Sequence, residues 1–127
     1  GIAGLNAGLD FIVQKGINVI REHQTRLANM FIEGLKELPC VNILGQEESN
    51  KRMAVVSIGV QGRDLGELAY RLDQDYDIEV RPGLHCAPLA HKTIGTYPEG
   101  TLRFSFGCFN TPQEILYGIR ALQELLQ

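Results

Sequence analysis

Apolar residues recur at helical spacing in the N-terminal part of the chain. A short helix is expected at Ile2–Phe11, with Gly16 interrupting the pattern that follows. A longer helix is predicted at Ile17–Leu38, because its apolar positions step by three, four or seven residues and so share one face. Pro39 is expected to end it. That face consists of Ile17, Ile20, Leu27, Phe31, Leu35 and Leu38.

Capping sequences predict two further helices. Arg63–Tyr76 is expected to be helical, with Asp64 and Glu67 at the spacing of a capping box. The last helix is expected to begin in the same way, with an N-cap, a proline in the first helical position and a glutamate two residues later. Its start and its buried stripe are Thr111, Pro112 and Glu114, then Ile115, Ile119, Leu122 and Leu126.

Short apolar runs between the helices predict strands. They are Val41–Leu44, Met53–Val60, Ile78–Arg81 and Thr101–Phe106. Residues 46–52 are polar and are expected to form an exposed loop, and residues 82–100 to form a long loop without regular structure. This order predicts an α+β fold, a two-layer sandwich in which helices cover one face of a small, mostly antiparallel sheet.

Composition narrows the class of protein. The 127 residues suffice for one domain, and the 12 basic and 15 acidic side chains give a net charge of −3, which argues against a nucleic-acid binder. No stretch approaches the roughly 20 apolar residues of a membrane helix. Three cysteines without regular spacing favour a reducing compartment, so a cytoplasmic location is expected. Because the chain does not begin with Met, we expect it to be a piece of a longer protein.

The run RPGLHCAP at residues 81–88 is the main candidate for chemistry. Cys86 has His85 beside it and Arg81 five residues before it, and such electropositive surroundings favour a reactive thiolate. The residues alone leave a nucleophilic cysteine and an inert loop thiol equally open. Arg103, on an otherwise apolar strand, suits a carboxylate ligand, although an outward-facing charge would give the same pattern.

A metal site is a third hypothesis, with ligands from His85, Cys86 and His91. Their spacing does not match the paired ligands of common zinc sites. Of the remaining histidines and cysteines, His23 is expected to be exposed or at a contact surface, whereas Cys40 and Cys108 are expected to be structural.

Several segments together resemble the C-terminal domain of group II cysteine desulfurases and selenocysteine lyases, which are pyridoxal-phosphate enzymes of the class V aminotransferase superfamily and have fold type I. The resemblance covers essentially the whole chain, from an Ala-Gly-Leu-Asp-Phe helix onward. Its specific motifs are Arg81-x-Gly83-x-His85-Cys86-Ala87, Thr101-Leu102-Arg103-x-Ser105 and Asn110-Thr111-x-x-Glu114.

The resemblance implies the small domain of a larger, homodimeric enzyme, with residues 1–15 as the end of a connection from a cofactor-binding domain. It implies that Cys86 attacks the sulfur of substrate cysteine, leaving a persulfide and releasing alanine. A sulfur-acceptor protein is a further partner that the resemblance implies. Arg103 matches the arginine that holds the substrate carboxylate, Arg81 a second arginine near the site, and His85 a residue that modulates the thiolate.

Two departures from the family pattern matter. Leu84 stands where well-characterised members often carry a histidine, so the substrate stays open between cysteine, selenocysteine and another amino acid. No lysine occupies a Schiff-base motif, and the lysines are Lys15, Lys36, Lys51 and Lys92. We therefore expect the isolated chain to bind no pyridoxal phosphate productively and to be inactive.

Two alternatives remain beside the desulfurase. One is a class V aminotransferase or other pyridoxal-phosphate lyase in which Cys86 is an ordinary loop residue. The other is a stand-alone α+β binding module with a metal at His85, Cys86 and His91.

Overall fold

A computed structural model describes residues 1–45 and 53–127. The predicted loop at 46–52, with Glu47, Glu48 and Lys51, lies outside these residues. The elements in the described part are, in chain order, α1 Ile2–Lys15, α2 Ile17–Leu35, β1 Val41–Leu44, β2 Val55–Val60, α3 Leu65–Tyr76, β3 Arg81–Gly83, α4 Pro88–Ile94, β4 Thr101–Ser105 and α5 Pro112–Leu126.

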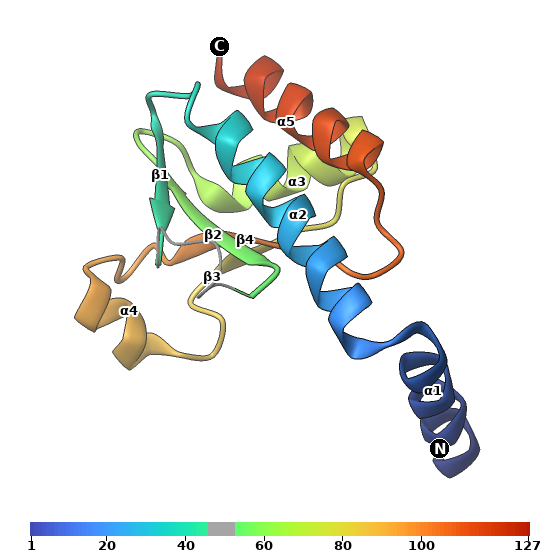
Figure 1. Ribbon diagram of the computed structural model, residues 1–127. Helices are drawn as coiled ribbons and strands as arrows, with labels where there is room; N and C mark the ends of the chain where they lie inside the picture. Colours follow the sequence, from blue (N-terminus) through green and yellow to red (C-terminus); the bar gives the residue numbers. More distant parts are fainter. Residues whose placement is uncertain (46–52) are drawn as a thin grey trace.

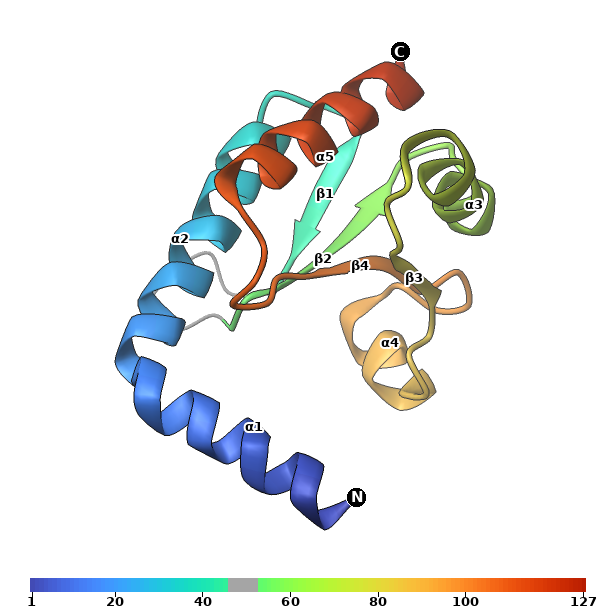
Figure 2. The ribbon, with the colours of Figure 1, turned by 90° about the vertical axis from the view of Figure 1, so that its right-hand side faces the viewer.

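The described strands form one antiparallel sheet in the order β1-β2-β4-β3. Helices α2, α3 and α5 lie together on one face of this sheet, whereas α4 lies apart from them beside β3 (Figures 1 and 2). The predicted α+β sandwich, with an antiparallel sheet and helices on one face, is therefore confirmed.

The core lies between the sheet and the three covering helices. Alternate residues of β2 are buried, and in register Val56 faces Phe104 and Ile58 faces Leu102 on β4. The ring of Phe31 on α2 packs against that of Phe104 with centroids 4.7 Å apart. Each such side chain contributes roughly 1.5–3 kcal/mol through the apolar area it buries. Burial of alternate strand residues assigns the other alternate residues to the helix-free face.

Both capping sequences start a helix, but only α5 has the two reciprocal bonds of a full capping box. At α5 the Thr111 hydroxyl accepts from the backbone N–H of Glu114 at 3.3 Å, and the Glu114 carboxylate accepts from the N–H of Thr111 at 2.7 Å. The latter bond is the main reason that the pKa of Glu114 is lowered. At α3 the Asp64 carboxylate accepts from the N–H of Glu67 at 2.8 Å.

Some boundaries differ from the prediction. The second helix ends at Leu35 rather than Leu38, since the N–H of Leu38 already bonds to the carbonyl of Leu35 in a turn. The third strand is Arg81–Gly83 rather than Ile78–Arg81. The N–H of Ile78 bonds back to Leu72 O at 2.9 Å, so the residues expected to open this strand instead close helix α3.

The segment 82–100 is not structureless, and that prediction was wrong. It contains β3 residues and helix α4, which starts with Pro88 at its first position. Helix α4 has seven residues, too few to show a periodic apolar face, and its buried residue is a histidine, His91. Apolar periodicity therefore gave no sign of it.

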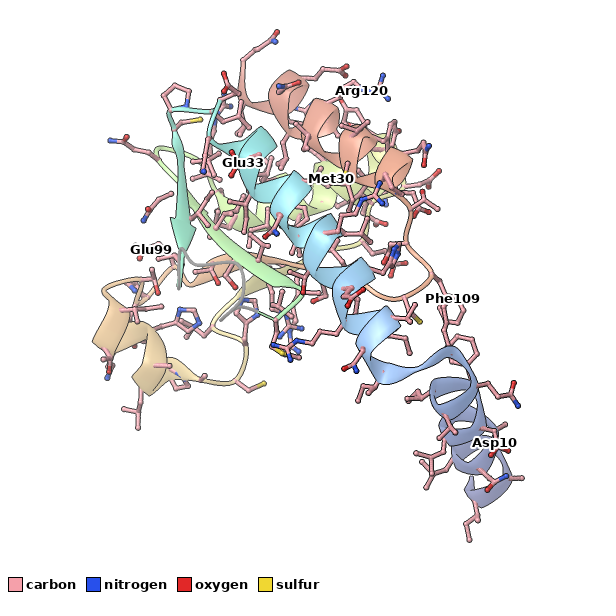
Figure 3. The ribbon with its side chains drawn as sticks, viewed as in Figure 1. Asp10, Met30, Glu33, Glu99, Phe109 and Arg120 are labelled. Atoms are coloured by element: carbon pink, nitrogen blue, oxygen red, sulfur yellow. The ribbon has the colours of Figure 1, made fainter. Side chains whose placement is uncertain are left out.

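Helix α1 projects away from the body of the protein (Figures 1 and 3). It has no buried residue and extends to Lys15, beyond the predicted end at Phe11. Its contact with the loop before α5 is made by the rings of Phe11 and Phe109, whose centroids are 5.4 Å apart, with the Lys15 ammonium over both. No helix in the described ranges is both long and apolar enough to cross a bilayer.

Candidate active site

Two arginines lie side by side on the helix-free face of the sheet. Arg81 of β3 and Arg103 of β4 are register partners, and Ser57 of β2 is the register partner of Arg103 on its other side. Side chains at such opposed positions start about 5 Å apart, and like charges there are destabilising. The pair is therefore unfavourable in the absence of an anion.

The guanidinium of Arg103 has an unused hydrogen-bond donor. Its Nε atom is buried and has no hydrogen-bond partner, and neither Arg103 nor Arg81 forms an ion pair with any carboxylate in residues 1–45 and 53–127. A planar guanidinium whose buried N–H has no hydrogen-bond partner can bind a carboxylate through two parallel hydrogen bonds. The arrangement thus suits a carboxylate ligand better than a solvated charge.

Cys86 lies close to the same pair of arginines. Its side chain is exposed, and Arg81 Nη2 donates to Cys86 Sγ at 3.5 Å. A guanidinium in this position stabilises negative charge on sulfur. The predicted electropositive setting of Cys86 is present.

The backbone at Cys86 is strained. His85 and Cys86 have φ values of 50° and 61°, in the left-handed region that costs residues other than glycine roughly 1–2 kcal/mol each. Gly83 and Gly100 flank the loop and touch, so that a Cβ on Gly100 would clash with the backbone of Gly83. This contact brings the two ends of the loop together beside β4.

His85 bridges the loop and the sheet. Its Nε2 is 2.9 Å from the hydroxyl of Thr101, which is buried at the start of β4, while its Nδ1 is buried without a partner. Burial lowers the pKa of His85, and electrostatic interactions with Arg103, His91 and Arg81 lower it further. These effects favour the neutral ring.

His91 completes the cluster from α4. It is buried, its Nδ1 is 2.7 Å from the Thr96 hydroxyl, and its ring centroid is 5.7 Å from that of His85. Among the residues that the structure describes, no three His, Cys, Asp or Glu side chains are grouped to hold a metal ion. The hypothetical set of His85, Cys86 and His91 is therefore not arranged as a metal centre.

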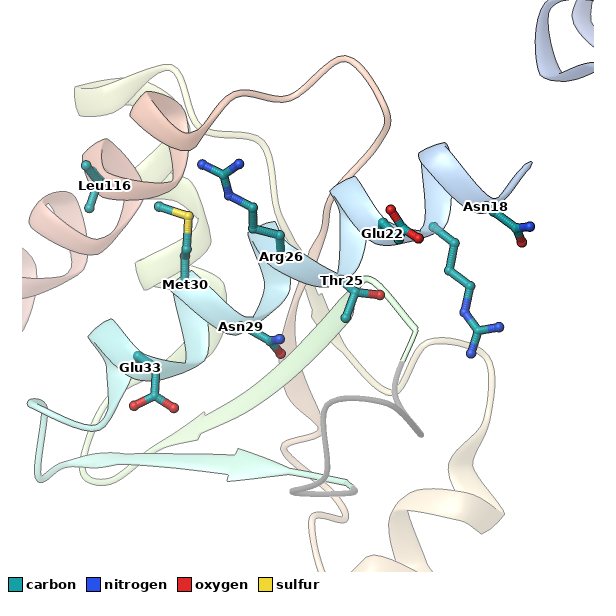
Figure 4. A pocket seen from close by; sticks show the side chains of 9 residues that line it. Asn18, Glu22, Thr25, Arg26, Asn29, Met30, Glu33 and Leu116 are labelled. Carbon is teal, nitrogen blue, oxygen red and sulfur yellow. The ribbon is translucent and has the colours of Figure 1, made fainter. Parts of the chain in front are cut away.

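The other candidates lie elsewhere. His23 is half-buried rather than freely exposed, and its Nε2 is 2.8 Å from the carbonyl of Asn110, so it fixes the segment before α5. Cys40 packs against the core as predicted, and Cys108 is half-buried. A hollow of about 940 Å³ runs along α2 between Asn18 and Glu33 and does not include the cluster (Figure 4).

Sequence reasoning missed Thr96 and Thr101. Thr101 stands two residues before Arg103 on the same strand, so period-two alternation assigns both to one face and could have found it. Thr96 has no such signal, since it lies in the turn after α4.

The described lysines do not fit a cofactor attachment point. Lys15 lies over two phenylalanine rings, Lys36 pairs with Glu33 at 2.7 Å, and Lys92 lies over Tyr97. None bonds to a residue of the arginine, cysteine and histidine cluster. Each of the three described lysines thus has its contacts away from this cluster.

In a comparison with known families, residues 1–117 match the model of the aminotransferase class-V family. The chain belongs to this family, whose cysteine desulfurase members use pyridoxal phosphate.

Its relatives are named more narrowly. A probable cysteine desulfurase of Pyrococcus abyssi is 33% identical over 127 residues, which are 100% of this chain and 31% of the relative. The apo structure of a cysteine desulfurase from Thermococcus onnurineus NA1 is 35% identical with a TM-score of 0.91, covering 97% of this chain and 30% of that one. The Escherichia coli cysteine desulfurase CsdA, in an S-sulfonic acid form, is 25% identical with a TM-score of 0.88, covering 100% and 31%. The chain thus spans about a third of these proteins' length.

Proposed function

We propose that this chain is the part of a pyridoxal-phosphate-dependent cysteine desulfurase that receives the sulfur and binds the substrate carboxylate. The observation that carries the proposal is the convergence of Arg81, Arg103 and Cys86 at one end of the helix-free face, with Arg81 Nη2 3.5 Å from Cys86 Sγ. The names of the relatives supply the reaction class.

The carboxylate of an amino-acid substrate is assigned to Arg103. An anion there would satisfy the buried Nε and relieve the repulsion between Arg103 and Arg81. Binding at this point fixes one end of the substrate, which lets the sulfur at its other end approach Cys86 in one orientation.

The covalent step belongs to Cys86. Its thiolate attacks the sulfur of L-cysteine, so that an S–S bond forms while the substrate's Cβ–S bond breaks and its electron pair goes to carbon. A proton added at that carbon gives alanine, and Cys86 is left as a persulfide. Arg81 stabilises the sulfur anion before attack.

Pyridoxal phosphate, when bound, supplies the electron sink that this bond cleavage needs. Since the described lysines lie away from the cluster, we assign cofactor binding to parts of the full-length protein outside this chain, and we expect the 127-residue chain alone to be inactive. Selenocysteine is the main alternative substrate, because the cluster holds no group that selects between the two chalcogens.

The exposed position of Cys86 supports a second transfer. Cys86 and the neighbouring Ala87, Pro88 and Leu89 are all exposed. A persulfide there would be open to attack by the thiol of a sulfur-acceptor protein.

The apolar surface of α1 supports a further contact. Six of its large apolar side chains are more than a third exposed, and no residue of α1 is buried. We assign this helix to the connection with the rest of the full-length protein, since most of its apolar surface stays exposed within the described residues although Phe11 packs on Phe109.

The test uses the full-length protein loaded with pyridoxal phosphate and given one equivalent of L-cysteine. After digestion without reductant, mass spectrometry is expected to show one added sulfur on the Cys86 peptide, with an equal amount of alanine released. Cys86→Ala should abolish both products, whereas Cys108→Ala, a matched change at a half-buried cysteine outside the cluster, should leave them unchanged. Alanine release that persists in Cys86→Ala would instead favour an enzyme in which Cys86 is only a loop residue.

A further inference from the structure

The strained turn that carries Cys86 has few ties of its own. The bonds within it are from the N–H of Ala87 to the carbonyl of Leu84 at 2.8 Å and from the N–H of His91 to the carbonyl of Ala87 at 3.2 Å. Two successive left-handed residues persist only where the surroundings hold them. The question is which side chains do so.

The ring of His85 is held from two directions. On one side it bonds to Thr101, a buried residue of the sheet. On the other side it faces the ring of His91, tilted by 45° at a centroid distance of 5.7 Å. Displacing either neighbour would free the residue that starts the left-handed turn.

His91 is itself rigidly placed. It is the buried residue of α4, 5% exposed, although the rest of that helix is exposed. Its ring bonds to Thr96 at 2.7 Å, and its carbonyl accepts from the N–H groups of Gly95 and Thr96 at the end of the helix. Side chain and backbone are therefore fixed at the same residue.

We propose that His91 is a positioning residue for Cys86: its ring, anchored by Thr96, packs on His85 and so maintains the left-handed turn that places the sulfur beside Arg81. Its importance for turnover rests on the proposed function, in which Cys86 accepts the sulfur. The positional effect itself is a property of the fold and can be measured without turnover.

A different role for His91 would be to anchor α4 and nothing more. In that case its loss would lower the stability of the region without a selective effect on Cys86. The two roles make different predictions for loss of the hydrogen bond between His91 and Thr96. Only a positioning role predicts that this loss changes the reactivity of Cys86 while the rest of the protein is unchanged.

The experiment measures the rate of alkylation by iodoacetamide at Cys86, with Cys108 in the same molecule as the internal reference. Site-specific rates come from mass spectrometry of peptides from the 127-residue chain, repeated in the full-length protein. Because displacing the sulfur from Arg81 removes the stabilisation of its charge, we expect His91→Leu to lower the Cys86/Cys108 rate ratio by about fivefold, the population change that release of such strain implies.

Smaller changes isolate the anchor. Thr96→Val removes the hydroxyl at nearly constant volume and should lower the ratio by about twofold or more, whereas Thr96→Ser keeps the hydroxyl and should restore it. His23→Leu is the matched control, since His23 also makes one bond, to Asn110 O at 2.8 Å, but it lies on α2 and is far from the loop in sequence. It should leave the ratio unchanged.

An unchanged or higher ratio in both His91→Leu and Thr96→Val would overturn the proposal. If His91→Leu unfolds the chain, seen as fast alkylation of Cys40 and Cys108 as well, the Thr96 pair decides alone. A lowered ratio without persulfide on Cys86 in the preceding test would keep His91 as a positioning residue and reject the desulfurase function. An unchanged rate ratio together with a persulfide on Cys86 would keep the desulfurase function and reject the role of His91.

Discussion

The imidazole of His85 is surrounded by groups that oppose its protonation. Burial lowers its pKa first, and Arg103, His91 and Arg81 add to the effect. Because the pKa is lower in the folded than in the unfolded state, the unfolded chain binds the proton more readily. His85 therefore contributes full stability above pH 6.5, and this contribution declines as the pH falls from there towards the folded pKa.

We expect NMR titration of the ring protons to show His85 protonating below pH 6.5. Arg103→Leu should raise its pKa towards that value without reaching it, because burial, the larger cause, remains. Arg120→Leu changes an exposed arginine on α5 and should leave the titration in place. Equal shifts in both variants would mean that net charge, and not the neighbouring guanidinium, acts on His85.

At this scale the sequence was informative about which residues matter but not about how they meet. The run of residues 81–88 and the alternation around Arg103 identified Cys86, His85, Arg81 and Arg103 as candidates. The register of β3 with β4, which places the two arginines side by side, depends on long-range pairing that local patterns do not encode.

At the scale of elements, the helices with long apolar faces and capping residues were predicted well, and the short elements were not. The start of α5 follows from Thr111, Pro112 and Glu114, whose effects are local. Helix α4 is held by one buried histidine, and β3 by its neighbour β4, so neither has a local signal. Short elements of this kind exist because of their tertiary contacts.

The contact between Gly83 and Gly100 yields a prediction for the loop they flank. Gly100→Ala should destabilise the chain by about 2 kcal/mol or more, because its methyl group would meet the backbone of Gly83 in addition to straining a positive φ. Thermal and urea unfolding measure the loss. Gly95→Ala has a similar φ, 75° against 80°, but open space around it, and should cost only the strain, about 1 kcal/mol.

Equal losses in the two glycine variants would show that backbone strain alone matters. A larger loss of stability at Gly100 would show that the close approach of the two loop ends leaves no room for a methyl group.

At the scale of the whole molecule, the buried core and the exposed apolar side chains of α1 lie in different parts of the structure. The core lies under α2, α3 and α5, whereas α1 extends outward with apolar side chains in solvent (Figures 1 and 2). The sequence predicted residues 1–15 to be the end of a connection from another domain, and an exposed apolar helix is what such a connection would leave in this chain.

Replacing Leu5 and Leu9 together by Gln should leave the melting temperature unchanged and reduce the binding of a hydrophobic dye, because these side chains are 66% and 53% exposed. Leu122→Gln is the contrasting change. Leu122 is fully buried, and a polar group there should cost about 3 kcal/mol or more. A fall in melting temperature for the α1 variant comparable to that of Leu122→Gln would mean that α1 belongs to the folding unit.

The backbone contact of Gly83 with Gly100 has one more consequence. The segment between them leaves the sheet and returns to it at a single point, and within it His85 bonds to Thr101 of β4 and Cys86 accepts from Arg81 of β3. A change in the length of the segment beyond these residues therefore need not shift the strands on either side. The residues between Gly83 and Gly100 can therefore be replaced by another sequence while the strands keep their places. Arg103 remains on the sheet to hold a carboxylate, while the inserted residues decide which reactive group is brought to it.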